Sequence, residues 1–580
     1  MTGMPGGRQT STGENVRPKR LARLMSLLVL ALLLVATGCF GGSTHHPPKP
    51  AVVPPVTATT TEPPQSRPNI LVIEADDMRT DELRFMPNVR AYIERTGLNF
   101  ANSFAPYPLC CPSRSSFLSG EYAHNHGVLG TRAPFGFQAF NDSHTIATAL
   151  QAGGYDTALV GKYLNGYGQQ PIHGTNRSSL HYVPPGWTDW MAGSDHLWKP
   201  GQKFQGGTYN YFHLTQLING TLRQFPNRYN TTVQATQTRG LISKYAASPK
   251  PWFIWWTPIA PHYGNPRESD DPPPIRQDNG RTIKFETPAR PKWVKGIYDK
   301  QITHGLGVPP GHPAEANMSD KPLYLRRQPP LNAQEKAALT NVSRQRAESL
   351  YVLDHQIGIT LNRLRSTGQY ANTVLVFTSD NGYYLGEHRK RQGKINLHEP
   401  SLRVPFLISG RGIPHGVRYD PITTVDLAPT FLNLAGLPAM PRTDGINMVP
   451  VIKHGDRGWK VPVVTEGMMS AYPTGVRRWG FNSQLNTRGL RLGRWKITRY
   501  QTGEVELYDL QKDPLELNSL QANPKYAGVL RMMRRLELQY MNCKQAQCRK
   551  PLPKRWQVSV AEERSITLHE LARTAQYYDS

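Results

Sequence analysis

Short β-branched and aromatic runs alternate with helical patterns from Pro68 onward, and this alternation limits what the chain can fold into. One helix is clear from an apolar stripe at spacings of three and four residues. The stripe consists of Leu350, Leu353, Ile357, Leu361 and Leu364. The predicted strands are Asn69–Glu74, Asp156–Val160, Trp252–Thr257, Thr373–Thr378 and Val404–Ile408. Strands that alternate with helices in this way predict an α/β sheet.

The chain of 580 residues is long enough for two folded units, and its composition changes along its length. Residues 40–67 are rich in Pro and Thr without apolar periodicity, which predicts an extended tether. Residues 263–335 are Pro-rich and charged, and we interpret them as an insertion that shapes the substrate site. The predicted divisions are a targeting segment (1–39), the tether (40–67), a main domain (68–454), a smaller C-terminal subdomain (455–550) and a C-terminal tail (551–580).

The C-terminal subdomain is inferred from a change of pattern after residue 455. Short strands are expected around Gly489–Tyr500 and Glu504–Leu507, followed by a helix around Ala527–Met541.

The N-terminal segment has the order of a bacterial export signal. Basic residues precede the apolar run Leu24–Val35, which is too short for a comfortable membrane span. The run ends at Ala36-Thr37-Gly38-Cys39, which resembles a lipobox with Cys39 as the residue that is lipidated. We expect an exported protein, either a cell-surface lipoprotein held to the membrane by its lipid or a secreted protein.

Charge and cysteine content restrict the partners. The 68 basic and 42 acidic residues leave a net charge of +26, which fits an anionic partner or a surface tuned for solubility. No basic motif interleaved with aromatic residues supports nucleic-acid binding. Of the five cysteines, Cys543 and Cys548 are candidate disulfide partners in an exported protein, whereas the adjacent Cys110 and Cys111 have no evident structural purpose.

Polar residues follow four of the predicted strands. They are Asp76 and Asp77, Lys162, His262, and Asp380 with Asn381. Because ligands bind beyond the carboxyl ends of strands in open α/β sheets, we expect these residues to meet in one active site. Asp76, Asp77, Asp380 and Asn381 offer only oxygen donors, which suit Ca²⁺ or Mg²⁺ better than zinc. Each pair also has a purely structural reading, as a helix cap or a turn.

Cys110 begins the stretch Cys-Cys-Pro-Ser-Arg, which is followed by Leu118-Ser-Gly. Pro112 and Ser113 suit a helix start, so Cys110 is expected where helix amides favour an anion or lower a thiol pKa. The alternative is a capped helix that carries a buried cysteine.

These motifs resemble the sulfatase family of the alkaline-phosphatase superfamily, in which Cys-x-Pro-Ser-Arg directs the oxidation of cysteine to formylglycine. The resemblance covers roughly residues 68–550 and includes Gly393-Lys394, Arg403-Val-Pro and Asp513-Pro-Leu-Glu. It implies an alkaline-phosphatase-like sandwich with a large mixed, mainly parallel sheet and a smaller C-terminal α+β subdomain. It also implies calcium, with magnesium less favoured, and maturation of Cys110 to 3-oxoalanine by a formylglycine-generating enzyme.

Within the family, the chain looks most like glucosamine-6-sulfatases and extracellular heparan endosulfatases. The features that carry this resemblance are the double cysteine, Gly120-Glu-Tyr-Ala-His-Asn-His and Gly161-Lys-Tyr-Leu-Asn. The resemblance implies a sulfated sugar or glycan as substrate, with N-acetylglucosamine 6-sulfate or a heparan-type glycan as the expectation. The pair Cys543/Cys548 recurs in bacterial relatives.

The resemblance assigns roles that the residue types support. The metal is held by Asp76, Asp77, Asp380, Asn381 and the modified Cys110. This metal and the guanidinium of Arg114 hold a hydroxyl of the hydrated aldehyde, and that hydroxyl attacks sulfur. Lys162 and Lys394 bind sulfate oxygens, and His262 protonates the leaving sugar oxygen. The second hydroxyl then expels sulfate and restores the aldehyde.

The sequence departs from the family pattern in three places. Leu164 and Asn165 stand where many sulfatases have a histidine, so Asn165, or a histidine from His124 and His126, is expected to contact sulfate. His398 replaces a common tyrosine, and the insertion 263–335 matches no family pattern. A phosphate or phosphonate monoester hydrolase, an arylsulfatase for small substrates and a non-catalytic binder of anionic polymers remain the alternatives.

Overall fold

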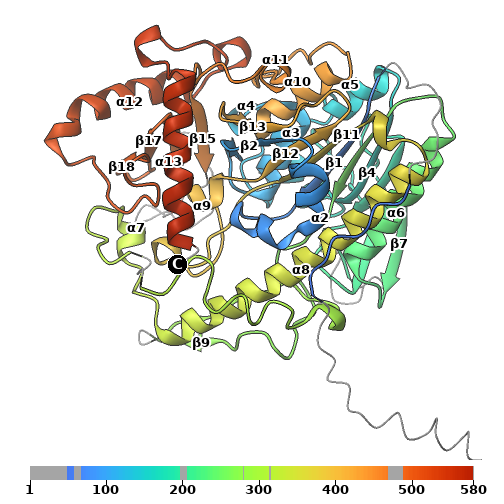
Figure 1. Cartoon of the computed structure of the whole chain (residues 1–580), viewed down its shortest axis with the longest axis horizontal. Helices are drawn as coiled ribbons and strands as arrows, with labels where there is room; N and C mark the ends of the chain where they lie inside the picture. The colour runs from blue at the N-terminus through green and yellow to red at the C-terminus, as the bar shows by residue number, and fades with distance from the viewer. Residues whose placement is uncertain are drawn as a thin grey trace, which may run out of the picture. The chain divides into compact units, whose positions relative to one another are not determined.

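The four strands that precede the polar residues are neighbours in one ten-stranded sheet. They are β1 (Asn69–Ala75), β4 (Asp156–Lys162), β8 (Trp252–Thr257) and β11 (Thr373–Ser379). They run parallel in the order β11-β1-β8-β4, so their carboxyl ends lie at the same edge (Figure 1). The structure is a computed structural model that describes residues 49–57, 67–195, 206–277, 280–311, 315–467 and 487–578. The predicted signal segment with Cys39 lies outside these residues.

Further strands extend the sheet on both sides. β5 (Asp189–Gly193) continues the parallel run, and β6 (His213–Ile218) and β7 (Thr221–Pro226) complete that side as antiparallel strands. On the other side lie β12 (Phe406–Gly410), β2 (Leu98–Phe100) and β13 (Gly416–Arg418). β12 begins two residues later than predicted, after Pro405, which has no backbone N–H for strand pairing. The mixed, mainly parallel sheet agrees with the predicted fold class.

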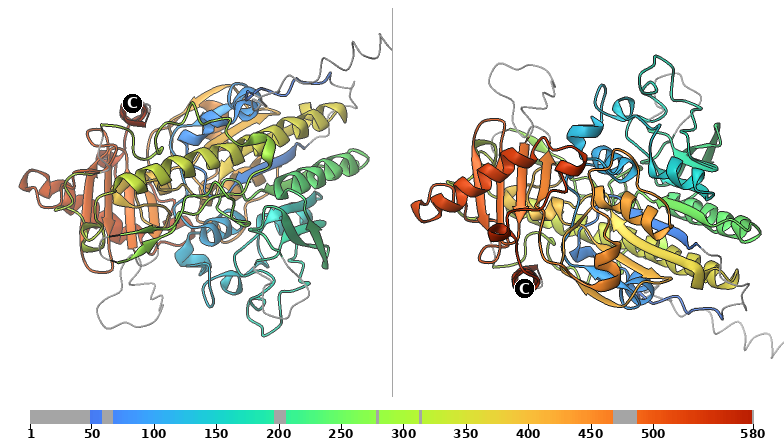
Figure 2. Two further views of the ribbon diagram at one scale, coloured as in Figure 1. Left: turned by 90° about the horizontal axis from the view of Figure 1, so that it is seen from below. Right: turned by 90° about the horizontal axis from the view of Figure 1, so that it is seen from above.

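Helices cover both faces of the sheet, and alternate residues of β1 face the two layers. Ile70 and Val72 pack with residues of α3 (Cys110–Ser119), α5 (Ile146–Ala152) and α10 (Thr424–Leu434). Leu71 and Ile73 pack with residues of α6 (Asn230–Ala246) and α8 (Ala333–Ser366) (Figures 1 and 2). The apolar stripe predicted from Leu350 to Leu364 is the buried side of α8.

The segment 263–335 contains little regular structure. Its main elements are the short hairpin β9 (Ile275–Arg276) and β10 (Thr282–Ile283) and the helix α7 (Leu323–Arg326). Phe285, Val294 and Tyr298 pack in one cluster with Leu339 and Val342 of α8. The Arg290 guanidinium makes a buried ion pair of 2.6 Å with Glu348 of α8. The segment therefore rests on α8 through both apolar and charged contacts.

A second sheet of four antiparallel strands forms the C-terminal part. Its strands are β15 (Val463–Gly467), β16 (Thr487–Leu492), β17 (Trp495–Arg499) and β18 (Val505–Asp509), and α12 (Ala527–Tyr540) packs on it. The stretch expected as one strand at 489–500 is instead the hairpin β16–β17, which turns at Gly493 with φ of 53°. The positive φ at that turn favours glycine.

Residues predicted as a tail contain the helix α13 (Val560–Tyr578). Its inner face carries Glu570, which pairs with Arg491 at 2.7 Å and Arg403 at 3.1 Å. Its last turn places the Tyr578 hydroxyl 3.1 Å from the Glu387 carboxylate. Helix α13 is therefore part of the folded protein. Across the described part of the chain, none of the helices combines the length and apolar character needed to span a membrane.

Candidate active site

All six polar residues predicted to follow the strands are buried at the carboxyl edge of the sheet. The Asp77 backbone N–H donates to Asp380 Oδ1 at 3.0 Å, and the Lys162 ammonium lies 2.6 Å from Asp76 Oδ2. The Nε2 atom of His262 lies 3.6 Å from Asp77 Oδ2. The structure therefore brings together residues from the ends of β1, β4, β8 and β11.

A cluster of oxygen donors forms the centre of the site. The Asn381 amide donates to Asp77 Oδ1 at 2.7 Å. Asp77 Oδ2 and Asn381 Oδ1 are buried and accept no hydrogen bond from any residue that the structure describes. Asp77 also has a φ of 68°, a conformation that non-glycine residues rarely adopt and that recurs at ligand sites.

These orphaned oxygens fit a hard divalent cation. One ligand atom from each of Asp76, Asp77, Cys110 and His262 lies within 4.8 Å of the others. Asp76 and Asp77 give this group two carboxylates, and the neighbouring Asn381 adds an amide oxygen, donors that suit Ca²⁺ or Mg²⁺. A bound cation would supply the missing partner of the buried oxygens and would offset the carboxylate charges.

Cys110 is the first residue of α3 and lines a cavity beside the site. Its sulfur accepts a hydrogen bond from the Lys394 ammonium at 2.7 Å and lies 3.4 Å from Asp76 Oδ1. Burial raises the pKa of the Cys110 thiol well above its ordinary value, and the charge of Asp76 adds to this shift. The expectation of a lowered thiol pKa at the helix start is therefore wrong, because desolvation and the carboxylate outweigh the helix amides and the lysines.

Three cations surround Cys110 and the acids. The Arg114 Nε atom donates to Asp380 Oδ2 at 2.8 Å, and its Nη2 atom is buried without a partner among the described residues. Lys162 pairs with Asp76, and Lys394 pairs with Asp77 as well as with Cys110. Burial acts to raise the pKa of Asp76, but the charges of Lys162 and His262 outweigh it and lower the pKa to about 2. The site can therefore hold an anion beside a carboxylate cluster.

His262 presents one ring nitrogen to the acids. Its Nδ1 lies 2.6 Å from the Tyr263 carbonyl oxygen, which can only accept, so Nδ1 carries a proton. Burial lowers the pKa of His262 below its ordinary value, although Asp76 and Asp77 act in the opposite direction. Nε2 therefore faces Asp77 and can carry the second proton when the ring is charged.

The cavity next to Cys110 has a volume of about 1240 Å³, far more than one sulfate group needs. Cys110, Lys394, His262 and Asn165 all line it. The segment 263–287 supplies much of the remaining wall, including Arg267 and Lys284. A substrate with a bulky group attached to the reacting sulfate fits such a space.

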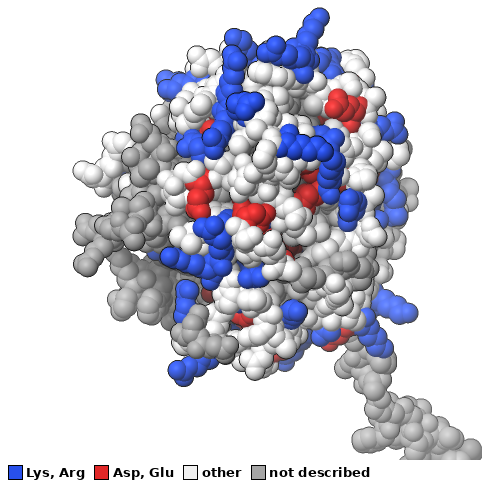
Figure 3. All heavy atoms as spheres, turned by 90° about the vertical axis from the view of Figure 1, so that its left-hand side faces the viewer, with Lys and Arg blue, Asp and Glu red and all other residues white. Residues whose placement is uncertain are grey.

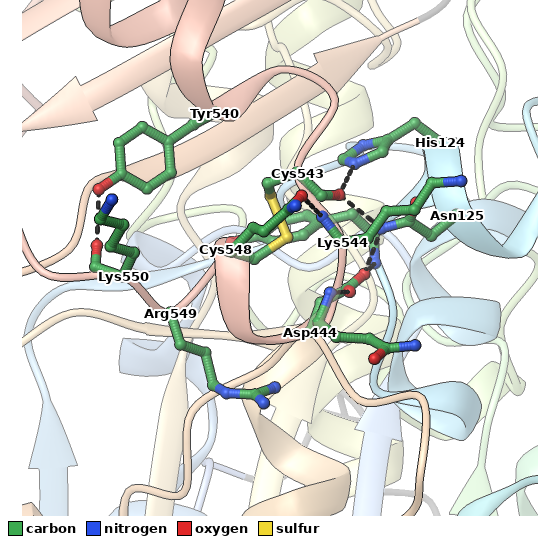
Figure 4. Close-up of a disulfide and its surroundings, with 12 residues drawn as sticks. His124, Asn125, Asp444, Tyr540, Cys543, Lys544, Cys548, Arg549 and Lys550 are labelled. Carbon is green, nitrogen blue, oxygen red and sulfur yellow. Dashed lines mark hydrogen bonds between the residues drawn. A yellow bond between two sulfur atoms is a disulfide. The ribbon is translucent and has the colours of Figure 1, made fainter.

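His124 is not among the described residues that line this cavity. The suggestion that His124 contacts sulfate is therefore corrected. The short helix α4 (Ala123–His126) directs its ring instead to the Glu466 carboxylate, at 3.1 Å. The ring also lies 2.8 Å from the Cys543 carbonyl (Figure 4). The neighbouring Asn125 donates to the same carbonyl at 2.9 Å. Cys543 is bonded to Cys548 in a disulfide with an S–S length of 2.04 Å. His126 is buried and hydrogen-bonds Ser116 at 3.0 Å.

Sequence reasoning missed two residues that touch this machinery. Glu74, the penultimate residue of β1, lies 3.3 Å from the Arg114 guanidinium, and burial raises its pKa to about 7. Tyr209 lies with its ring 5.0 Å from the Lys162 ammonium and 4.7 Å from the His262 ring. A glutamate within an apolar strand was a visible signal for Glu74. Tyr209 comes from an irregular segment without a comparable pattern.

Comparison with known proteins identifies the family of this chain. The sulfatase family model matches residues 68–437, and the model described as "N-sulphoglucosamine sulphohydrolase, C-terminal" matches residues 386–543. An arylsulfatase of Volvox carteri is 29% identical over 530 residues, which cover 84% of this chain and 76% of that protein. An N-acetylglucosamine-6-sulfatase of Capra hircus is 26% identical over 528 residues, which cover 84% of this chain and 85% of that protein.

The fold also matches solved structures. One, described as a complex with its substrate D-glucosamine-2-N,6-O-disulfate, has a TM-score of 0.62 at 21% identity and covers 82% of this chain and 98% of its own. The family model spans more than half of the chain and includes every residue of the acid and cation cluster. The chain belongs to the sulfatase family and is a sulfuric ester hydrolase.

Proposed function

We propose that this sulfatase uses a formylglycine at position 110 and a Ca²⁺ ion to remove the 6-sulfate from glucosamine residues of sugars or heparan-type glycans. The observation that carries the proposal is the position of Cys110. It is the first residue of Cys-x-Pro-Ser-Arg and stands between the carboxylate cluster and the cations Lys394 and Lys162. A thiol in that place has no evident packing purpose, whereas a nucleophile there would face a bound sulfate.

The proposed metal ligands are the oxygens of Asp76, Asp77, Asp380 and Asn381 together with the modified residue 110. When bound, Ca²⁺ would supply Lewis acidity to the hydrated formylglycine and to a sulfate oxygen. The ammonium groups of Lys162 and Lys394 would bind the other sulfate oxygens and stabilise the charge that develops on them. Arg114, held by Asp380 and Glu74, would fix the position of the nucleophile.

His262 is the proposed acid for the leaving oxygen. Its Nδ1 is held by the Tyr263 carbonyl, so only Nε2 is available to deliver a proton on the cavity side. Proton transfer from a positioned histidine typically contributes a factor of about 10²–10⁴ to the rate. Asp77, 3.6 Å from Nε2, favours the charged form that can act as an acid.

Four observations support a sugar substrate. One relative is named as an N-acetylglucosamine-6-sulfatase, and one structural neighbour holds a glucosamine disulfate as its substrate. The cavity has room for a sugar behind the sulfate. The net charge of +26 and the many Lys and Arg side chains on the face with the C-terminal sheet suit an anionic glycan (Figure 3).

Export and maturation complete the proposal. The segment 1–39 would direct the chain out of the cytoplasm, with Cys39 as the lipid-anchored residue of a surface lipoprotein or with cleavage and release. A formylglycine-generating enzyme would act on Cys110, and no nucleic-acid partner is proposed. The disulfide between Cys543 and Cys548 suits an oxidising compartment.

The test compares substrates of the matured enzyme. We expect turnover of N-acetylglucosamine 6-sulfate and of 6-O-sulfated heparan fragments, with kcat/KM for the fragments falling as salt screens the encounter. The rival is a small aryl sulfate, which the name of the Volvox carteri relative suggests. Faster turnover of a chromogenic aryl sulfate than of any sugar sulfate, with no salt dependence, would contradict the sugar proposal. Faster hydrolysis of matched phosphate or phosphonate esters would contradict the proposed sulfate substrate.

A further inference from the structure

Asp195 is an acidic residue in the wall of the cavity that contains Cys110. It follows the parallel strand β5 by two residues, at the edge of the sheet where the other site residues lie. Only 9% of its surface is exposed. A carboxylate so deeply buried needs hydrogen-bond donors to offset the loss of hydration.

The carboxylate of Asp195 is only half satisfied. Its Oδ2 accepts the Gly166 backbone N–H at 2.8 Å, and its own backbone N–H donates to the Tyr167 carbonyl at 3.0 Å. These bonds hold the side chain in place. Its Oδ1 is buried and receives no hydrogen bond from the described residues around it. Because the carboxylate is held in place, its unpaired oxygen can accept a hydrogen bond from a ligand in the cavity.

Asn165 repeats this pattern in the same cavity wall. Its Nδ2 donates to the Tyr209 hydroxyl at 2.6 Å, which fixes the amide, while its Oδ1 is buried without a donor in the described part of the chain. Thr208, next to Tyr209, donates its backbone N–H to the Ser194 carbonyl at 2.9 Å, which ties Tyr209 to the segment with Asp195. The two orphaned acceptors therefore belong to one connected wall.

This wall adjoins the reacting centre. The ring of Tyr209 lies beside Lys162, a proposed sulfate ligand, and His262, the proposed acid for the leaving oxygen. Asn165, which donates to the Tyr209 hydroxyl, and Asp195, which lines the same cavity, therefore lie on the side where the group attached to the sulfate would bind. A negative carboxylate repels a second sulfate, so the group that Asp195 suits is an uncharged donor such as a hydroxyl or an amide N–H.

We propose that Asp195 and Asn165 accept hydrogen bonds from hydroxyl or amide N–H groups of the sugar that carries the sulfate, and so select carbohydrate sulfates over aryl sulfates. The inference rests on the proposed sugar substrate and adds the residues that recognise it. An aryl ring without such donors leaves both acceptors buried and unpaired. Sites built to hydrogen-bond a substrate group discriminate strongly against analogues that lack it.

The experiment measures kcat/KM of the matured full-length enzyme for N-acetylglucosamine 6-sulfate, its 3-deoxy and 4-deoxy analogues, and an aryl sulfate. In Asp195→Ala we expect the sugar-to-aryl ratio of kcat/KM to fall roughly 10- to 100-fold, as for a lost hydrogen bond to a charged group. We also expect the variant to lose the discrimination that the wild type shows against one deoxy analogue. Asp195→Asn, which keeps the side-chain size, provides the same readout if the alanine variant is unstable.

Asp142→Ala is the matched control. Asp142 is also 9% exposed and receives a hydrogen bond of 3.0 Å from Tyr182, but it is not among the described residues that line the cavity. The sugar-to-aryl ratio of kcat/KM in the Asp142→Ala variant should stay at the wild-type value. An unchanged ratio and an unchanged deoxy pattern in both Asp195 variants, with the wild type hydrolysing the sugar, would overturn the inference alone. A wild-type enzyme that hydrolyses no sugar sulfate would overturn the proposed function and the inference together.

Discussion

The ammonium of Lys394 donates a hydrogen bond of 2.7 Å to the sulfur of Cys110, although the two residues are 284 positions apart in the chain. Lys394 lies after β11 on a loop that returns to the site, and it also pairs with Asp77. An ammonium shared by the proposed nucleophile position and a proposed metal-binding carboxylate suits the sulfate-binding role proposed for Lys394.

We expect Lys394→Met to reduce kcat by a factor of about 10²–10³, the usual cost of removing one donor from a charged transition state. Formylglycine content should stay at the wild-type level, because maturation reads the segment around Cys110. The control is Lys390→Met, since Lys390 contacts Asn396 and the Tyr384 ring instead of the site. Steady-state kinetics measures kcat, and peptide mass analysis measures the formylglycine content. Equal losses of kcat in the two variants would contradict a specific role for Lys394.

The two adjacent cysteines should behave differently. Cys110 lines the cavity, whereas Cys111 is buried in the core with its sulfur 3.8 Å from the Asn165 carbonyl. Conversion of a thiol to an aldehyde removes about 18 Da, by simple atomic arithmetic applied to cysteine oxidation. We expect this loss at Cys110 in a mass spectrum of the peptide covering residues 90–132.

Variants separate the roles of the two cysteines. Cys110→Ala should abolish turnover with little change in thermal stability, and Cys111→Ala should keep most of the activity at a cost of about 1 kcal/mol in stability, as for a small core truncation. Active protein with an unmodified Cys110 would contradict the prediction.

The oxygen cluster should bind one Ca²⁺. Chelation should remove activity and lower the melting temperature, because Asp76, Asp77 and Asp380 would then repel one another without a cation. Calcium should restore both properties better than zinc. Isothermal titration of the chelated protein measures the binding directly.

Asp77→Asn is expected to weaken calcium binding in that titration by a factor of 10 or more, roughly the effect of losing one charged ligand. Asp271→Asn is the control, since Asp271 lines the cavity and is held by the Thr287 hydroxyl at 2.7 Å. Stoichiometric zinc in the purified protein would contradict the assignment.

His124 should contribute to stability and not to sulfate binding. Its ring joins Glu466 and the carbonyl of the disulfide residue Cys543, and Glu466 raises the pKa of His124 even though burial opposes the shift. His124→Ala should lower the melting temperature and leave KM for the sulfate ester close to the wild-type value. A large rise in KM without loss of stability would restore His124 to the site.

Stability should fall as the pH rises from 4.5 to about 10, because of a buried acid on α13. Burial raises the pKa of Glu563 from an ordinary value of 4.5 to about 10, and the charge of Asp420 adds to the shift. The native protein therefore keeps a proton that the unfolded chain loses above pH 4.5, so the contribution of Glu563 to stability falls as pH rises between these two values.

Glu563→Gln removes this dependence. We expect the variant to match the wild type in melting temperature near pH 4.5 and to exceed it by about 2 °C or more at pH 8.5. Glu562→Gln is the control, because Glu562 is the exposed neighbour on the same helix. Parallel melting curves of Glu563→Gln and the wild type over this pH range would contradict the predicted linkage.

The fold class and most of the acid and cation cluster could be predicted from the order of the amino acids. Periodicity identifies a strand or a helix locally. Because ligands bind at the carboxyl ends of parallel strands, one site could be predicted at the edge that holds Asp76, Lys162, His262 and Asp380. The Cys110 motif could be recognised because it is a contiguous signal. Its helix start was also predictable, but the raised thiol pKa was not, since it depends on burial and on Asp76.

Which side chains of the irregular segments reach the site depends on how the whole chain packs. Tyr209 and Asp195 enter the cavity wall through the loops beside β5 and β6, whose paths depend on packing rather than on any periodicity. His124 lies close to the Cys110 helix in sequence. Its ring nevertheless points toward the disulfide, where it contacts the Glu466 carboxylate and the Cys543 carbonyl. Local patterns record which face of an element is buried, but the contacts between distant loops arise only when the whole chain packs.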